Sequence, residues 1–312
     1  MEAGARSVGR AVAGAAVAGL AGVGWALTET RMFALRQAEV PVLAPGSRPV
    51  HILHVSDLHL VPGQRRKTAW VRSLGELAPD LVVSTGDHMA HEKAVPAVLE
   101  AYQPLLDLPG AFVFGSNDYF GPQPKNPARY LRSDSRQDSD RDEMRRLPSA
   151  ALAEAFRRSG WTDLTNRRDR LEIAGTDVSL VGVDDPHLDY DEFPDRPDGA
   201  ENGALHLGVA HAPYQRVLRE MHRDHCDLVL AGHTHGGQLR VPGYGALVTN
   251  CDLDRGRVSG LHGWPGPRPD EPGGATSTWL HVSAGLGTSP YAPVRFACRP
   301  EASLLRLVPR AD

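Results

Sequence analysis

Short apolar segments that end in polar residues recur along the chain from residue 50 onward. They are rich in β-branched side chains and bounded by Gly, Asp, Asn or His, which is typical of buried strands that lead into loops. The expected strands cover residues 51–56, 81–85, 111–115, 178–183, 205–210, 227–232 and 278–285. Helical patterns lie between several of them, at residues 67–77, 95–106, 150–159 and 214–221. This alternation predicts a layered α/β domain.

An uncharged segment rich in alanine and glycine precedes this domain. It covers residues 11–28, and a bilayer core requires about 20 apolar residues, so the segment is just long enough for a membrane anchor. A cleaved signal peptide and a soluble alanine-rich helix stay open as alternatives. We expect residues 1–28 to form an apolar helix that makes the protein membrane-associated. Two arginines precede the segment and two follow it closely, so the side of the membrane stays open.

Two further segments differ from the strand and helix pattern. Residues 29–49 end in a proline-rich stretch that cannot continue a helix, which predicts a linker before a domain of residues 50–312. Residues 129–146 mix charges of both signs and contain few apolar side chains. This composition predicts a solvated loop inserted in the domain, with a lid over a site as the alternative.

Charge and cysteine content exclude several classes of function. The formal net charge of -4 and a pI near 6.4 give no basic excess for a nucleic-acid-binding surface. Three cysteines without C-x-x-C spacing argue against a disulfide scaffold. The fourteen histidines are more informative, because several stand beside carboxylates.

Polar residues with metal-binding side chains follow five of the expected strands. The loops at the carboxyl ends of strands in an open α/β sheet converge on one crevice, so these side chains are expected to meet. Each group alone is compatible with a turn or a helix cap, but together they would be costly to bury unless cations held them. Mixed oxygen and nitrogen donors suit Mn, Fe, Zn, Co or Ni. The five groups are Asp57 with His59, Gly86 with Asp87, Asn117 with Asp118, His211, and the run from Gly232 to Gly237 that contains His233 and His235.

The order Asp-x-His, Gly-Asp, Asn, His, Gly-His-x-His resembles the calcineurin-like metallophosphoesterases. It is most similar to a branch of bacterial membrane-associated phosphohydrolases whose last motif reads Gly-His-Thr-His-Gly-Gly-Gln, here Gly232 to Gln238. A Gly-x-Gly at residues 285–287 and Arg295 extend the likeness, which covers about residues 50–310. The resemblance implies a four-layer α/β/β/α sandwich with two divalent metal ions, Mn, Fe, Zn or Co, at the strand ends.

The resemblance also implies roles for individual residues. It assigns seven metal ligands: Asp57, His59 and His235 for one ion, Asn117, His211 and His233 for the other, and Asp87 as the bridge. It implies attack of a metal-bridging hydroxide on a phosphodiester, phosphomonoester or phosphoanhydride. Asn117, Asp118 and His211 are the expected catalytic residues. The expected substrate is a phosphate ester, either a small molecule or a lipid-linked compound.

One position departs from the family pattern. The family block Gly-Asn-His reads Ser-Asn-Asp at residues 116–118, so Asp118 stands where a histidine is thought to protonate the leaving group or position phosphate. A carboxyl near two cations has a lowered pKa and is a poor proton donor at neutral pH. We expect Asp118 to orient His211 or another histidine. His88 or His187 could supply the missing imidazole, and a leaving group that needs no proton would also resolve the difficulty.

The leading hypothesis is a metal-dependent hydrolase of phosphate esters, with a phosphodiesterase first. The alternative is a non-catalytic metal-binding scaffold of the same fold, although such scaffolds tend to lose ligands and all seven positions are filled here. A zinc peptidase or amidase is remote, because the chain lacks His-Glu-x-x-His. The sequence does not predict the oligomeric state.

Overall fold

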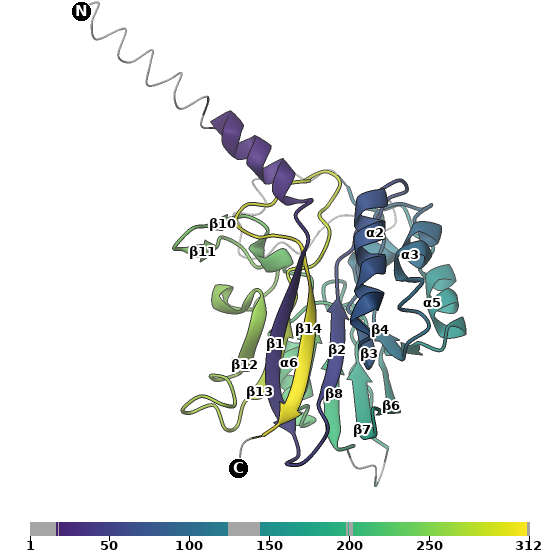
Figure 1. The fold of residues 1–312 in the computed structure, drawn as a ribbon, viewed down its shortest axis with the longest axis vertical. Coiled ribbons are helices and arrows are strands. Elements are labelled where there is room, and N and C mark those ends of the chain that lie inside the picture. Colours follow the sequence, from purple (N-terminus) through teal and green to yellow (C-terminus); the bar gives the residue numbers. More distant parts are fainter. Residues whose placement is uncertain (1–16, 18, 124–143, 198, 200–201, 311–312) are drawn as a thin grey trace, which may run out of the picture.

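Two six-stranded sheets form the centre of the molecule (Figure 1). The computed structural model describes residues 17, 19–123, 144–197, 199 and 202–310. In spatial order, the first sheet consists of β1 (Ala34–Leu43), β14 (Glu301–Pro309), β2 (Val50–Val55), β3 (Leu81–Ser84), β4 (Gly110–Phe112) and β5 (Thr162–Asp163). The second consists of β12 (Gly260–Trp264), β13 (Thr278–Val282), β9 (Leu228–Ala231), β8 (Leu205–Val209), β7 (Thr176–Gly182) and β6 (Arg167–Ile173).

Helices cover the outer faces of the two sheets. The first sheet is covered by α2 (Arg65–Ser73), α3 (Val95–Tyr102) and α5 (Ser149–Arg158), which stand together on one side in Figure 1. The second is covered by α6 (Gln215–Arg223), whose apolar face packs on β7 and β13. The remaining short elements are η1 (Leu74–Leu77), α4 (Ser116–Tyr119), η4 (His235–Gly237), β10 (Arg240–Val241), β11 (Gly245–Ala246) and η5 (Arg255–Arg257).

Three apolar cores separate these layers. The middle core lies between the sheets, where Ile52 and Val83 of the first sheet pack with Leu207 and Leu230 of the second. The two outer cores lie between each sheet and its helices. Strands β3 and β8 are buried along their whole length, as expected of parallel strands covered on both faces. The layers therefore follow the order helix, sheet, sheet, helix, which is the predicted sandwich.

Residues 34–43, which the sequence analysis assigns to a linker, form strand β1. This strand pairs in parallel with β14 from the other end of the chain, from Ala34 opposite Glu301 onward. It is an edge strand, and a proline such as Pro41 is tolerated there because the outer side needs no ladder hydrogen bond. The sheet thus begins before residue 50, and the proline that suggested a linker lies within a strand.

The N-terminal segment is helical where the structure describes it. In the described part of the chain, no helix is long and apolar enough to cross a membrane. The prediction of a membrane-spanning helix within residues 1–28 is therefore not supported; residues 1–16 and 18 lie outside the described residues.

The predicted charged loop also lies mostly outside the described residues. Residues 124–143 are not described, which leaves only residues 144–146 of the predicted loop 129–146. Neither the loop nor the lid interpretation is tested by the structure.

A charged cluster at the end of α6 connects this helix to the second sheet. Asp224 accepts hydrogen bonds from both terminal nitrogens of Arg168 on β6, at 2.7 and 2.9 Å, and from Arg196 at 2.7 Å. The Nε2 atom of His206 on β8 lies 2.8 Å from the same carboxylate. Burial opposes ionisation, but these hydrogen bonds outweigh it and hold the pKa of Asp224 well below its ordinary value.

Replacing this carboxylate is expected to destabilise the fold. Asp224→Asn leaves two guanidinium groups without their ionised partner, so we expect the free energy of unfolding at pH 7 to fall by about 2–3 kcal/mol. Because the pKa of Asp224 is lowered in the folded state, its stabilisation is present above an unfolded pKa of about 3.9 and is lost as the pH falls below it. Urea denaturation should therefore show a difference between variant and wild type that narrows below about pH 4.

The exposed pair of Arg268 and Asp270 provides the control for this measurement. Asp270→Asn should change the free energy of unfolding far less, because exposed ion pairs contribute little. Equal losses of unfolding free energy in the two variants would show that the Asp224 cluster contributes no more to stability than an exposed ion pair does.

Candidate metal centre

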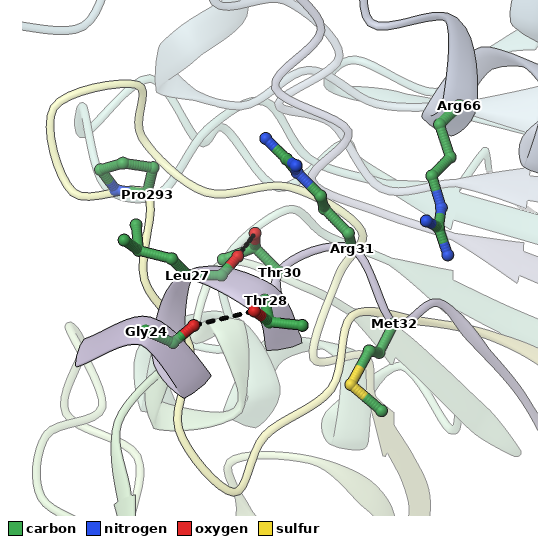
Figure 2. A pocket seen from close by; sticks show the side chains of 8 residues that line it. All are labelled: Gly24, Leu27, Thr28, Thr30, Arg31, Met32, Arg66 and Pro293. Carbon is green, nitrogen blue, oxygen red and sulfur yellow. Dashed lines mark hydrogen bonds between the residues drawn. The ribbon is translucent and has the colours of Figure 1, made fainter. Parts of the chain in front are cut away.

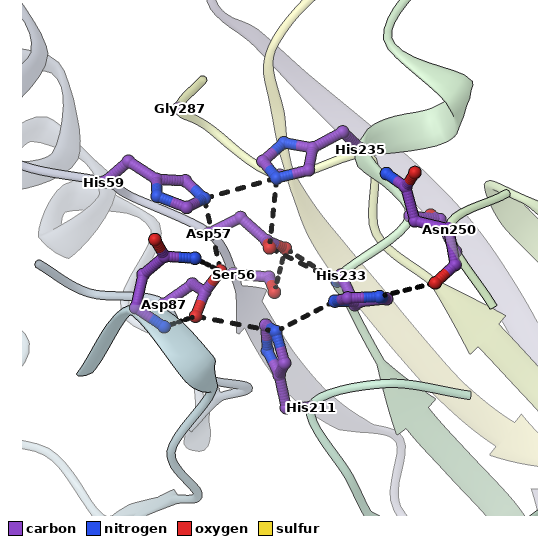
Figure 3. Close-up of polar contacts among 12 residues, drawn as sticks. Ser56, Asp57, His59, Asp87, His211, His233, His235, Asn250 and Gly287 are labelled. Carbon is purple, nitrogen blue, oxygen red and sulfur yellow. Dashed lines mark hydrogen bonds and ion pairs between the residues drawn. The ribbon is translucent and has the colours of Figure 1, made fainter. Parts of the chain in front are cut away.

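Loops at the carboxyl ends of three strands bring carboxylates and imidazoles together (Figure 3). Asp57 and His59 follow β2, Asp87 follows β3, and His235 follows β9. One ligand atom from each of these four residues lies within 4.8 Å of every other. The Nε2 atom of His59 is 3.2 Å from Nε2 of His235 and 3.3 Å from Oδ2 of Asp87. All four residues are buried, which makes this group a candidate metal site.

A second set of side chains surrounds Asp87 on its other side. The Nε2 atom of His211, after β8, lies 3.6 Å from Oδ1 of Asp87 and 3.3 Å from Nδ1 of His233. Asn117 in α4 donates to Asp87 twice, from its backbone N–H and from its side-chain amide, each at 2.8 Å. Asp87 is therefore the residue that both sets share, which is the position expected of a bridge. The structure brings all seven predicted ligands together.

The backbone at these positions adopts a conformation that is rare outside glycine. Positive φ angles occur at Asp57 (52°), His59 (43°), Asp87 (54°), His233 (68°) and His235 (50°). Residues of this kind cost about 1–3 kcal/mol each and concentrate at functional sites. Tight left-handed turns therefore present these five side chains.

Two glycines allow the loops to approach the carboxylates closely. A Cβ atom on Gly232 would lie 1.9 Å from Oγ of Ser56 and 2.6 Å from Oδ2 of Asp57. A Cβ atom on Gly115 would lie 2.4 Å from Oδ1 of Asp87. Any side chain at these two positions would therefore displace a predicted metal ligand.

The pKa values of the clustered groups move in opposite directions. Burial raises the pKa of Asp57 to about 6 and lowers that of His59 to about 4. Burial also acts against charge on His211, but the carboxylates of Asp87, Asp57 and Asp185 outweigh it and raise the pKa of His211 to about 9. The direction of this shift shows that the buried carboxylates favour positive charge at this position.

The residues present fit divalent cations. Two carboxylates, an amide and four imidazoles form a mixed oxygen and nitrogen donor set of the kind that Mn, Fe, Zn and Co accept. The two closest imidazole nitrogens, on His59 and His235, point at each other and at the carboxylates, so a cation between them would replace several unfavourable contacts. The identity and number of the ions do not follow from this geometry.

A family model described as calcineurin-like phosphoesterase matches residues 50–237, which is more than half of the chain. The chain belongs to the calcineurin-like phosphoesterases. The matched range contains all seven predicted metal ligands, so the expected superfamily is confirmed and a phosphoesterase is the activity that membership indicates. The bond that is hydrolysed is a separate question.

Several relatives of this calcineurin-like phosphoesterase carry related names. The uncharacterized metallophosphoesterase YkoQ of Bacillus subtilis is 28% identical over 82% of this chain and 83% of its own. The phosphodiesterase YaeI of Escherichia coli is 28% identical over 90% of both chains. A transmembrane protein with metallophosphoesterase domain from Bos taurus is 28% identical over 88% of this chain and 57% of its own.

The structure does not bring Asp118 into the cluster. Its side chain is fully buried and accepts from the backbone N–H groups of His88 at 2.8 Å, Met89 at 3.3 Å and Gly115 at 3.1 Å. The Nδ1 atom of His88 lies 3.0 Å from the same carboxylate. Asp118 thus orients a histidine as expected, but this histidine is His88 and not His211. It connects the loop after β3 to the start of α4.

The two histidines considered as substitutes occupy different environments. His88 is fully buried, and its Nε2 atom lies 2.8 Å from Oγ of Ser84, so it faces the outer core. His187 is half-buried beside the cluster, with its ring 4.7 Å from that of His233 and its Nδ1 atom 3.0 Å from the hydroxyl of Tyr214. Of the two, only His187 contacts a predicted ligand.

Two cationic residues behind the cluster support its loops. Lys67 on α2 donates to the carbonyl of Leu58 at 2.6 Å, between two predicted ligands, and burial lowers the pKa of Lys67 to about 7. Arg295 is fully buried, donates to the carbonyls of residues 284, 285 and 287, and lies 3.3 Å from Nδ1 of His235. The family resemblance pointed to Arg295. Lys67 was missed, because a lysine in a helical pattern ordinarily faces solvent.

A second group of ligand-type side chains does not form a comparable site. His206, Asp224 and Cys226 lie close enough together to hold an ion. Both oxygens of Asp224 already accept from Arg168 and Arg196, as described above. A cation there would have to displace two guanidinium groups.

The position of Asp118 leads to a prediction about its role. In Asp118→Asn, an amide N–H₂ faces the N–H of Gly115 or the ring of His88, so we expect the free energy of unfolding to fall by about 1–3 kcal/mol. Activity per folded molecule should fall much less. Urea denaturation and hydrolysis of bis-p-nitrophenyl phosphate would measure the two effects.

Asp107→Asn, at an exposed position, is the matched control and should change neither quantity. A stable but inactive Asp118→Asn protein would contradict the structural role and indicate that Asp118 takes part in the reaction.

Proposed function

We propose that this chain is a metal-dependent hydrolase that cleaves phosphate esters at the cluster around Asp87, with phosphodiesters as the first substrate class. The observation that carries the proposal is the convergence of four buried ligand atoms within 4.8 Å of one another. Family membership supports the reaction class. Divalent cations held there would neutralise phosphate oxygens and lower the pKa of a coordinated water.

The protein's own residues would hold and orient these components. Asp57, His59 and His235 would bind one ion and His211 with His233 the other, while Asp87 faces both sets. The amide of Asn117, already directed at Asp87, lies where it can bind an ion or donate to a phosphate oxygen. Ser56 donates to Oδ2 of Asp57 at 2.5 Å, and the backbone N–H of His233 donates to both oxygens at 3.1 and 3.2 Å. These bonds fix the carboxylate with Oδ1 3.6 Å from Nε2 of His235.

Removing either a bridge or a terminal ligand tests the proposal. Asp87→Ala and His235→Ala should each abolish hydrolysis of bis-p-nitrophenyl phosphate and the binding of at least one ion, because each removes a buried donor. The measurements are turnover with Mn, Fe, Zn or Co restored after chelation, and metal content of the purified protein.

His51→Ala is a suitable control for these variants, because His51 lies at the amino end of β2, away from the cluster. It should retain activity and metal. Full activity in Asp87→Ala would disprove the site assignment. Bound metal without turnover in the wild-type protein, under every metal, would favour the non-catalytic scaffold.

The absence of a histidine after Asn117 predicts a strong dependence on the leaving group. A positioned general acid contributes about 10²–10⁴-fold to a reaction whose leaving group needs a proton. Without one, the rate should fall steeply along a series of aryl phosphodiesters as the leaving group becomes more basic. Single-turnover rates across this series would measure the slope.

A shallow slope would contradict this expectation and show that a side chain protonates the leaving group. His187→Gln would then be the first variant to compare, because His187 packs on His233 at the edge of the cluster.

A further inference from the structure

A cavity of about 640 Å³ lies between the N-terminal helix and α2 (Figure 2). The residues that line it come from three segments of the described chain: Gly24, Leu27, Thr28, Thr30, Arg31, Met32, Arg66 and Pro293. In Figure 2, Arg66 stands on one side and Pro293 with Leu27 on the other, with Arg31 between them. The lining therefore combines two positive charges with an apolar wall.

The side chains of the two cavity arginines are unpaired within the described part of the chain. Neither the guanidinium of Arg31 nor that of Arg66 has a hydrogen-bond or ion-pair partner among the described residues, and both side chains are exposed. Other arginines differ in this respect: Arg168 and Arg216, for example, are each paired with carboxylates. Two unpaired guanidinium groups that line one cavity are suited to bind a phosphate group, since arginine donates to phosphate in a forked geometry.

Two of the chain segments that line the cavity continue to residues that support the candidate metal centre. Arg66 precedes Lys67, whose ammonium group donates to the carbonyl of Leu58 between two predicted ligands. Pro293 precedes Arg295 by two residues, and the side chain of Arg295 contacts His235. The helix itself is attached to the same segment, because the backbone N–H of Arg295 donates to the carbonyl of Ala26 at 2.9 Å. The lining of the cavity and the support of the cluster therefore share chain segments.

Apolar side chains of the N-terminal helix are accessible. Val23 and Leu27, four residues apart on one face, are 56% and 45% exposed, and Leu27 also lines the cavity. On another face, Glu29 accepts from Nε1 of Trp25 and from the backbone N–H groups of residues 297 and 298, which fixes the helix to the domain. Apolar side chains thus extend from the cavity onto a surface that an alkyl chain could contact.

We propose that this cavity binds the phosphate-bearing headgroup of an amphiphile, with the phosphate between Arg31 and Arg66 and the alkyl part along Leu27, Met32 and Pro293. Binding in the cavity does not depend on the proposed function. Its consequence does rest on that function: amphiphilic phosphate esters would be the substrate class that the cluster hydrolyses. A free phosphate ion would use the arginines alone. The apolar wall and the exposed helix surface favour an amphiphile.

Binding without turnover tests this assignment. The probe is a short-chain dihexanoylglycerol phosphonate below its micelle concentration, which cannot be hydrolysed, titrated calorimetrically into the full-length, metal-loaded protein. Replacing both arginines, as Arg31→Gln with Arg66→Gln, should weaken its binding about tenfold, because two charged hydrogen-bonding partners are lost. Met32→Ser should also weaken the binding of the phosphonate lipid and leave the binding of inorganic phosphate unchanged.

Arg65→Gln is the matched control, because Arg65 is the exposed neighbour of Arg66 on α2 and does not line the cavity. It should bind the probe as the wild type does. Unchanged lipid binding in the double arginine variant would overturn the proposal. So would an equal loss for inorganic phosphate and the lipid, together with no effect of Met32→Ser, which would indicate a plain anion site.

Kinetics separate this inference from the proposed function. The double arginine variant should raise KM about tenfold for an amphiphilic phosphodiester, with kcat unchanged, and should leave hydrolysis of bis-p-nitrophenyl phosphate unaltered. An inactive wild-type protein that still binds the phosphonate lipid through both arginines would refute the hydrolase and retain the binding site. If the protein is active and the double arginine variant has the same KM for the amphiphile as the wild type, the binding site is refuted and the hydrolase is retained.

Discussion

The architecture depends on the cost of holding two carboxylates and four imidazoles together where little water reaches them. Asp57 and Asp87 are almost completely buried, and their negative charge is what raises the pKa of His211 to about 9 against the effect of burial. Ions with two positive charges would offset it more fully, because buried charges are tolerated when they are paired or bind metals. Binding such ions would also stabilise the folded state relative to the unfolded chain, in which the seven ligands are dispersed. The candidate metal site and part of the stability of the fold would then share one cause.

The two sheets supply the rigidity that this arrangement needs. Five predicted ligands have positive φ angles, which are unfavourable for residues with a side chain. Such turns persist when the surrounding structure determines them, and here buried strands lead into each one. Gly232 and Gly115 complete the arrangement, because any side chain there would occupy the space of a carboxylate. The backbone strain is concentrated at the strand ends, and the apolar cores on either side of each sheet oppose it.

Much of the interior could be predicted from the sequence, because central strands such as β2, β3 and β8 are continuous apolar runs that end in polar residues. The strands at the edges of the sheets were harder to predict. Strand β1 carries polar residues and a proline, and its partner β14 is more than 250 residues away, so no local pattern marks their pairing. The ligand positions could be predicted as a set, whereas the left-handed turns that present them could not. Asp118 shows the limit most clearly: the family position suggested chemistry, but the carboxylate faces three backbone N–H groups and His88.

The segment from Pro293 to Cys298 connects features that are far apart in the sequence. The side chain of Arg295 contacts His235, the backbone N–H groups of residues 297 and 298 donate to the carboxylate of Glu29, and Pro293 lines the cavity beside the N-terminal helix. A buried arginine with several carbonyl partners allows little independent movement of this segment. A shift of the N-terminal helix must therefore either break the Glu29 contacts or move Arg295 relative to His235. The helix is for this reason part of the environment of the candidate metal centre, and an amphiphile that fills the cavity would act on the same segment that supports one of the predicted ligands.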